Sequence, residues 1–292
     1  MPSFFTAITA AALAASTVNA IPHIARQASN STWTSSSSSS SQSCIAIPAP
    51  IAVDDATAKA AAAANLALAR NLTSQPTQID RFNALITVDG AGKELLSGKE
   101  LSSRVVFDFN KAAPAKNAKG GRILVANEDN FPILVGEGIS GAVAFLEPCS
   151  MNSPHTHPRA TEMLTVVQGK LKTGFMLENN FLKPDGSNAL TTQVSAELTP
   201  FQSTIFPMGS IHFQFNDQCE PATFVAALNS ADPGTSQIAQ NFFFLNESIV
   251  DVALGGVMSI DGSNIDMFRT KLPVNLVQDM DSCLARCSKP AY

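Results

Sequence analysis

The chain has 292 residues, a formal net charge of −5 and only 19 Lys and Arg residues. Nucleic-acid binding depends on basic surface, so this charge balance argues against a nucleic-acid partner. The length alone predicts about two domains of ordinary size.

Residues 1–20 have the composition of a signal peptide. Their apolar run is too short to span a bilayer, and it ends at the small residues Val18, Asn19 and Ala20. No Lys or Arg precedes the run, and a buried N-terminal helix is the alternative. A Ser-rich tract follows directly, which favours secretion with cleavage after Ala20. No later apolar run approaches transmembrane length, so no membrane association is expected.

Residues 21–50 form a Ser- and Thr-rich spacer with too little apolar surface to offset the entropy of ordering it. Such a spacer suits a secreted or wall-embedded protein. Glycosylation sequons begin at Asn30, Asn71 and Asn246, and in a secreted chain these predict a glycoprotein. The Ala-rich segment 51–75 predicts a helix that begins near Asp54 or Asp55 and packs outside the main domain.

The main domain is expected at 76–258, and from Ile79 onward the chain consists of short β-rich runs separated by Gly, Pro and Asn. The runs lie at 104–109, 122–127, 132–138, 141–148, 162–177, 193–201, 203–208, 211–216 and 223–230. Frequent strands that do not alternate with long helices predict an antiparallel sandwich or barrel. Helices are expected from about 236 to 254, followed by a helical tail at 259–292 with helices at 265–270 and 275–287. The predicted fold is mainly β, a jelly roll flanked by N- and C-terminal helices.

Three of the four histidines fall within two short stretches, PHTHPRATE and FPMGSIHFQFN. His155 and His157 are two residues apart, so on an extended strand both imidazoles leave the same face. Pro158 cannot donate to a strand ladder, and a bend there returns Glu162 toward the same point. With His212 from the second stretch, three imidazoles and one carboxylate predict a site for Mn, Fe, Ni, Cu or Zn.

These two stretches resemble the histidine motifs of the cupin superfamily, and are most similar to those of germins and spherulin-like fungal cupins. The similarity runs from about Gln78 to about Gly255. It implies a jelly-roll barrel and a manganese ion held by His155, His157, Glu162 and His212. The interval between Glu162 and His212 is longer than in plant germins, and the extra length is expected in a loop around 178–188.

The resemblance also implies chemistry on a small anionic or dioxygen-derived substrate: superoxide dismutation, or oxidation of a small dicarboxylate by dioxygen. Asn152 matches an asparagine that contacts substrate in oxalate-oxidising germins, although Asn-Ser-Pro is also ordinary turn chemistry. A second such asparagine would fall at Ala142, a departure that argues against oxalate oxidation.

Further candidates lie beside the ligands. Four apolar side chains around His212 either line a pocket or belong to the ordinary core: Phe206, Met208, Phe213 and Phe215. Arg159 and Thr161 are explained as well by pairing with neighbours or solvent as by catalysis.

Two other classes of function stay open. One is a non-catalytic cell-wall or spore-associated protein in which the metal only stabilises the fold. The other is a cupin dioxygenase that uses Fe, Cu or Ni on an organic substrate such as a flavonol. A homo-oligomer is compatible with each of them.

The chain contains five cysteines, an odd number for a secreted protein. If His212 faces the His155–His157 pair on an antiparallel strand, Cys149 and Cys219 lie almost opposite, one residue out of register. A bulge near residues 152–154 would correct the register, so a Cys149–Cys219 disulfide is predicted. The alternative is that both are buried thiols. Cys283 and Cys287 lie one helical turn apart, and one of them is expected to reach Cys44.

Overall fold

Residues 55–114, 118–179, 181, 192–253, 276–277 and 281–287 are described by a computed structural model. All of them belong to one unit, Ala46–Tyr292. Several expectations fall outside the described residues: the signal peptide, the spacer with Asn30, Cys44, the helix at 265–270 and most of the loop at 178–188. Asn71 and Asn246 are described, and both are exposed.

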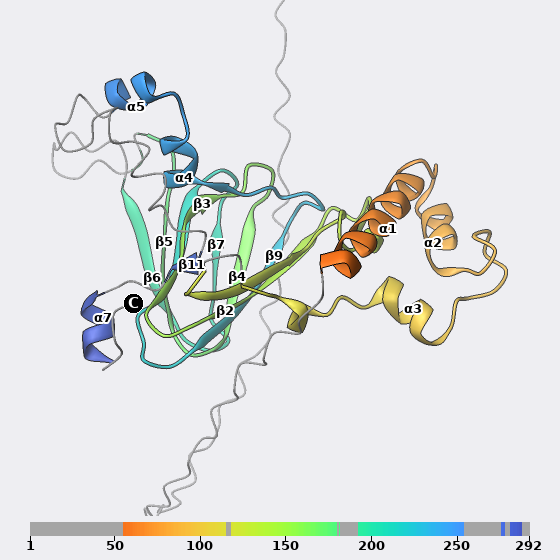
Figure 1. The fold of residues 1–292 in the computed structure, drawn as a ribbon, viewed down its shortest axis with the longest axis horizontal. Coiled ribbons are helices and arrows are strands. Elements are labelled where there is room, and N and C mark those ends of the chain that lie inside the picture. The colour runs from red at the N-terminus through yellow and green to blue at the C-terminus, as the bar shows by residue number, and fades with distance from the viewer. Residues whose placement is uncertain are drawn as a thin grey trace, which may run out of the picture. The chain divides into compact units, whose positions relative to one another are not determined.

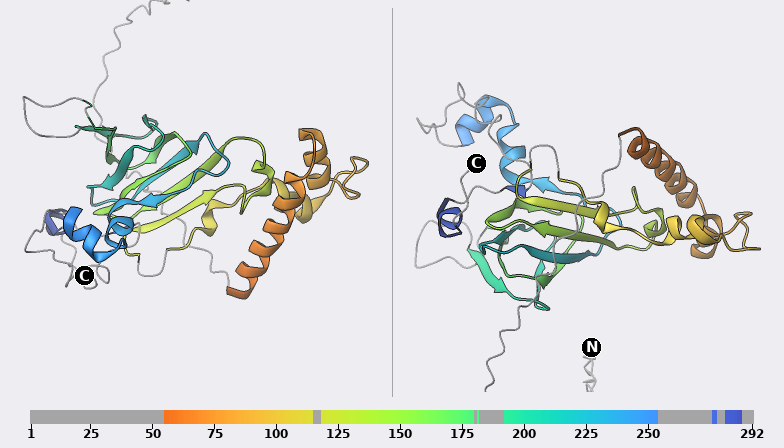
Figure 2. Two further views of the ribbon diagram at one scale, coloured as in Figure 1. Left: turned by 90° about the horizontal axis from the view of Figure 1, so that it is seen from above. Right: turned by 60° about the horizontal axis from the view of Figure 1, so that its bottom comes forward.

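Two antiparallel sheets form the body of the protein (Figures 1 and 2). The first sheet has the strand order β1 (Gly121–Ala126), β2 (Ser140–Leu146), β9 (Ala222–Leu228), β4 (Glu162–Gln168) and β7 (Ser203–Phe206). The second has the order β10 (Ser236–Gln237), β3 (Ser150–Thr156), β8 (Ile211–Asn216), β5 (Leu171–Met176) and β6 (Gln193–Leu198), with β11 (Leu276–Val277) also paired to β3. This arrangement is the predicted jelly roll.

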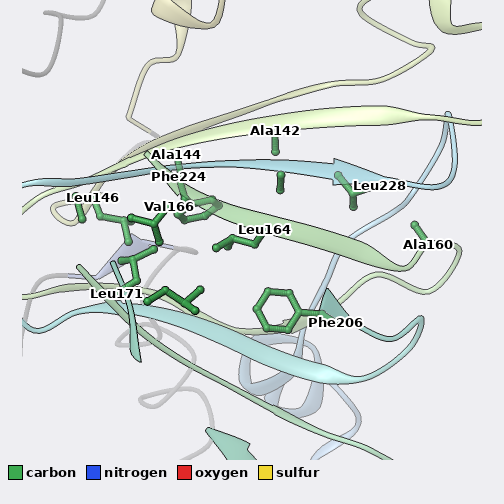
Figure 3. Packing of buried hydrophobic residues seen from close by; sticks show 13 residues of the cluster. Ala142, Ala144, Leu146, Ala160, Leu164, Val166, Leu171, Phe206, Phe224 and Leu228 are labelled. Atoms are coloured by element: carbon green, nitrogen blue, oxygen red, sulfur yellow. The ribbon is translucent and has the colours of Figure 1, made fainter. Parts of the chain in front are cut away.

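The inner faces of the two sheets enclose one apolar core (Figure 3). Leu164 and Phe224 enter it from the first sheet, and Leu171 and Leu198 from the second. Along β8 every second residue is buried, as the period of two in a strand requires. The same alternation turns His212 inward, so the core and the histidine site share the barrel interior.

Helices lie at both ends of the described chain. The N-terminal group consists of α1 (Asp55–Thr73), α2 (Gln78–Ile86), α3 (Gly98–Val105) and the 3-10 turns η1 (Phe109–Lys111) and η2 (Pro132–Leu134). Leu72, Leu85 and Val135 form a small second core within this group. The C-terminal helices are α4 (Ile238–Phe243), α5 (Glu247–Ala253) and α7 (Asp281–Arg286). Among the described residues, no helix has the length and apolar character needed to cross a membrane.

The prediction that β-rich runs begin after Ile79, with the first at 104–109, was wrong: among the described residues, 79–109 form no strand and contain only an isolated β-bridge between Thr87 and Leu95. Residues 78–86 form α2 instead, because Thr77 caps its N-terminus by accepting a hydrogen bond from the Asp80 amide at 3.2 Å. Val105 ends α3, and Val106 is 59% exposed. β-branched residues favour strands only where a half-buried ladder is available, and this segment has no partner strand among the described residues.

The predicted strand at 132–138 was also wrong. Pro132 opens the 3-10 turn η2, where its fixed φ is well tolerated. Gly136 and Gly138 follow with φ of 81° and 68°, which extended strands do not adopt. The apolar Val135 packs against the helices instead of a neighbouring strand.

The predicted Cys149–Cys219 disulfide is not formed. Cys149 is bonded to Cys283 in α7, and Cys219 to Cys287 directly after α7, so neither Cys283 nor Cys287 pairs with Cys44. The bulge lies in β3 where it was expected, between Asn152 and His155, but it shifts the register the wrong way. Cys149 therefore bonds through its amide to the Gln218 carbonyl at 3.2 Å. The cysteines do lie at one end of the β3–β8 pair, where Cys283 and Cys287 provide their partners.

Candidate metal centre

The four predicted ligands converge inside the barrel. His155 and His212 face each other directly across the β3–β8 ladder. His157 follows the end of β3, and Glu162 begins β4 after the turn at Pro158. All four side chains are buried, and their ligand atoms lie within 4.8 Å of one another. The spacing argument from the sequence therefore placed these residues together correctly.

Each imidazole is held at Nδ1 by a backbone carbonyl. The carbonyl oxygens and distances are Ser153 at 2.8 Å from His155, Gly234 at 2.6 Å from His157, and Ser210 at 2.9 Å from His212. A carbonyl oxygen only accepts hydrogen bonds, so the proton must lie on Nδ1 in all three rings. This leaves the Nε2 lone pairs available to a metal, the arrangement typical of metal-binding histidines.

The charges in the cluster are set by burial and by mutual contact. Burial raises the pKa of the Glu162 carboxyl, but the hydrogen bond with His157 and the close His212 imidazole outweigh this effect and hold the pKa at about 2. Burial, helped by His212, lowers the pKa of His155 to about 3. Burial also lowers the pKa of His157, but the Glu162 carboxylate, with Oε2 2.9 Å from His157 Nε2, raises it above the ordinary value. At neutral pH the site therefore combines an anionic carboxylate with a neutral His155.

The donor set fits a divalent ion. His212 Nε2 is buried without a hydrogen-bond partner among the described residues, 3.4 Å from Glu162 Oε2. A buried nitrogen lone pair without a donor is costly unless another ligand satisfies it. Three imidazole nitrogens and one carboxylate suit a borderline transition metal.

Phe206, one of the four candidate apolar side chains, is in direct contact with His212. Its ring stacks on His212, with the centroids 4.4 Å apart and the planes at 11°. Met208 is 62% exposed. Phe213 and Phe215 lie along a groove with residues of β5 and β6, apart from the ligands.

Arg159 and Thr161 both pair with neighbouring residues. Such pairing was one of the two roles considered for them from the sequence, and catalysis was the other. Arg159 forms an ion pair with Asp232 at 2.7 Å. Thr161 Oγ1 accepts a hydrogen bond from the Met208 amide at 3.1 Å. These contacts connect the turn after His157 to two other loops around the site.

A cavity of about 70 Å³ adjoins three of the ligands, His155, His157 and Glu162. Asn152 and Ala142 both line it, so the two positions singled out from the sequence do face the site. Asn152 donates a hydrogen bond to Gln214 Oε1 at 2.7 Å, deep in the barrel. A substrate contact by Asn152 stays a prediction.

The contribution of the segment at 234–237 to the site was not predicted from the sequence. Gly234 holds His157 through its carbonyl, while Thr235 and Gln237 line the cavity. In the sequence, these residues are marked only by the turn motif DPG just before Thr235. A turn motif does not indicate which part of the protein the turn contacts.

A jelly roll that brings three imidazoles and one carboxylate together defines a candidate metal-binding barrel. The model of the Cupin family matches residues 107–265, and the chain belongs to this family. It is 34% identical to Spherulin-1A of Physarum polycephalum over 225 residues, 77% of this chain and 80% of the relative. It is 35% identical to Germin-like protein 4-1 of Oryza sativa subsp. japonica, covering 70% of this chain and 80% of the relative. The protein is thus a germin- and spherulin-like cupin.

Among solved structures, a recombinant oxalate oxidase in complex with glycolate matches 62% of this chain and 87% of its own, with 22% identity and a TM-score of 0.46.

Proposed function

We propose that this protein is a secreted cupin that binds one manganese ion through His155, His157, Glu162 and His212 and has superoxide dismutase-type activity. The observation that carries the proposal is the buried cluster whose three rings present Nε2 toward one carboxylate. Among the borderline metals that this donor set suits, manganese is the one that the resemblance of the two histidine motifs to those of germins implies. When bound, manganese supplies one-electron redox chemistry at this site.

The residues around the cluster favour a small anion. A divalent ion, one carboxylate and three neutral imidazoles together carry a net charge of about +1, which attracts an anion. An engineered protein cavity of ~150 Å³ holds benzene, so a cavity of about 70 Å³ has room for roughly three to four heavy atoms. This size suits superoxide better than oxalate, which has six heavy atoms. Ala142 at the cavity wall also argues against oxalate, because its methyl group offers no hydrogen bond to a second carboxylate.

Secretion is supported by the two disulfides, because disulfides persist in oxidising compartments. The predicted leader at 1–20 supports the same location. Peptide mapping of protein recovered from the medium tests it, with an N-terminus that begins after Ala20 as the expected result.

The activity is tested on purified protein with known manganese content. We expect superoxide dismutation that disappears in Glu162→Gln, and little or no hydrogen peroxide from oxalate. Oxalate turnover at an enzymatic rate would contradict the proposal. If both assays read zero while manganese is fully bound, the metal has a structural role and the protein is not an enzyme of this kind.

A further inference from the structure

The cavity beside the cluster has two chemically different walls. The wall from the five-stranded sheet is apolar and consists of Ile123, Val125, Ala142, Phe224 and Leu228. The polar wall is formed by Asn152 of β3 and by Thr235 and Gln237 from the segment that contains β10. None of the described residues that line the cavity is Lys or Arg. A ligand here meets amide and hydroxyl groups on one side and hydrocarbon on the other.

Gln237 is directed into this cavity by the strand register. It lies directly opposite His155 in the β10–β3 pair. Residues that face each other in an antiparallel ladder project to the same side of the sheet, so the Gln237 side chain enters the barrel beside His155. Ser153 Oγ donates a hydrogen bond to Gln237 Oε1 at 2.8 Å. That bond fixes the oxygen of the amide and leaves its NH₂ group as a donor toward the cavity.

The backbone that carries Gln237 is anchored on both sides of Pro233. Arg159 binds the Asp232 carbonyl through Nε at 2.9 Å and the Asp232 carboxylate through Nη2 at 2.7 Å. Two residues later, the Gly234 carbonyl accepts the hydrogen bond from His157. Because these contacts fix the segment before any ligand arrives, little entropy is lost when Gln237 binds one.

We propose that Gln237 donates a hydrogen bond to a small anion bound beside the four-ligand cluster, and that the cavity selects a compact monocarboxylate of acetate size over a dicarboxylate. This inference rests on the proposed metal site. An acetate-sized ligand can direct its carboxylate to the polar wall and its methyl group to the apolar wall. A dicarboxylate would bury its second charge against hydrocarbon without a donor, which is strongly unfavourable.

The test uses the full-length, manganese-loaded protein with acetate as the probe. Acetate binding is followed by the change in the EPR spectrum of bound manganese, after elemental analysis has established the metal content of each variant. A hydrogen bond to a charged ligand is worth enough that Gln237→Leu should weaken acetate binding by about tenfold or more. Gln237→Glu should weaken it further, because a carboxylate repels the anion. Both variants should retain manganese.

The matched control is Gln193→Leu. Gln193 is also hydrogen-bonded to a serine, with Nε2 2.7 Å from Ser195 Oγ, but it lines the groove on β5, β6 and β8. This variant should bind acetate like the wild type. If Gln237→Leu loses metal, Ser153→Ala replaces it as the test, since it frees the Gln237 amide while the Ser153 carbonyl still holds His155. It should weaken acetate binding with metal retained.

The outcomes separate the two proposals. A wild-type protein that takes up no metal overturns both the metal site and the ligand assignment. Full metal with no effect of acetate, or acetate binding by Gln237→Leu within twofold of wild type, overturns the role of Gln237 and leaves the metal site standing. Where Ser153→Ala is used as the test, unchanged acetate binding in that variant likewise overturns the role of Gln237 and leaves the metal site standing. Oxalate that perturbs bound manganese as tightly as acetate does overturns the selectivity, whereas oxalate that leaves the spectrum of bound manganese unchanged at concentrations where acetate saturates supports it.

Discussion

His157 and Glu162 form the closest pair in the cluster, and this contact governs how the site responds to pH. The carboxylate raises the pKa of His157 above its ordinary 6.5, whereas the pKa of Glu162 stays at about 2. A metal must displace the proton from His157, while Glu162 remains ionised throughout the mildly acidic range. The histidine is therefore the group that couples metal affinity to pH.

We predict that metal affinity is constant above the raised pKa of His157 and falls by about tenfold per pH unit below it, since one proton is displaced. Competition with a chelator at several pH values between 8 and 5 measures this slope. Glu197→Gln, at an exposed carboxylate, is the control and should follow the wild-type curve. An affinity that does not change from pH 8 to 5 would show that His157 is not a ligand.

The segment at 232–237 contributes to the site although it is far from the ligands in sequence, and this contribution was not predicted. It binds His157 and lines the cavity. Gly234 has a φ of 65°, and a Cβ atom there would lie 2.9 Å from Arg159 Nη2 and 3.0 Å from Pro158 Cγ. A side chain at this position is strained by the positive φ and crowds Pro158 and Arg159, so we expect the segment or the turn after His157 to shift. The carbonyl that orients the His157 ring would move with it.

Gly234→Ala should consequently lower metal affinity by about 10–100-fold, the usual effect of losing a contact that orients a ligand. Gly138→Ala is a matched control, because Gly138 has a similar φ of 68° but open space around its Cβ position. Titration of both variants with manganese distinguishes loss of orientation from general backbone strain. Equal affinities in the two variants would rule out a role for the Gly234 carbonyl.

Helix α7 is attached to the barrel by covalent and ionic contacts. Two disulfides connect it to Cys149 and Cys219, and Arg286 binds the Asp217 carboxylate at 2.6 Å. The bonded cysteines are 134 and 68 residues apart in sequence, so each bond restricts the unfolded chain over a long loop. The loops overlap, and their contributions do not simply add.

The variant with both Cys283→Ser and Cys287→Ser should lose about 4 kcal/mol or more of stability and unfold on the order of 10 °C lower. Thermal unfolding of the manganese-loaded proteins measures this, with Cys44→Ser as the control that retains the wild-type Tm. Non-reducing peptide mapping of the wild type should recover Cys149 joined to Cys283. Recovery of a Cys149–Cys219 peptide would contradict the observed pairing.

At the scale of the whole molecule, the fold class and the four-residue cluster were predictable because their signals are local. Alternation marks strands such as β8, and the His155–His157 spacing with Glu162 just after Pro158 needs only a strand and a turn. Requiring the ligands to meet predicted that His212 faces either His155 or His157, and the structure pairs it with His155. Features that depend on contacts between distant segments were missed.

Two such contacts explain what could not be predicted. The partner of His157 Nδ1 is the carbonyl of Gly234, and a backbone carbonyl leaves no mark in the residue pattern. Cys149 finds its partner on α7, and no spacing rule gives the place where a C-terminal helix docks. Likewise, Val135 is a β-branched residue typical of strands, but it packs against helices. The helices bury its side chain, and this segment has no neighbouring strand with which to form a ladder among the described residues.

The central claim, that one divalent ion binds at the histidine–glutamate cluster, is tested most directly by elemental analysis of the purified protein. We predict one manganese per chain in the wild type and none in the variant with His155→Ala and His157→Ala. His23→Ala, which removes the one histidine outside the two motifs, should retain full metal. Stoichiometric metal in the double variant, or a wild type without metal, would contradict the claim.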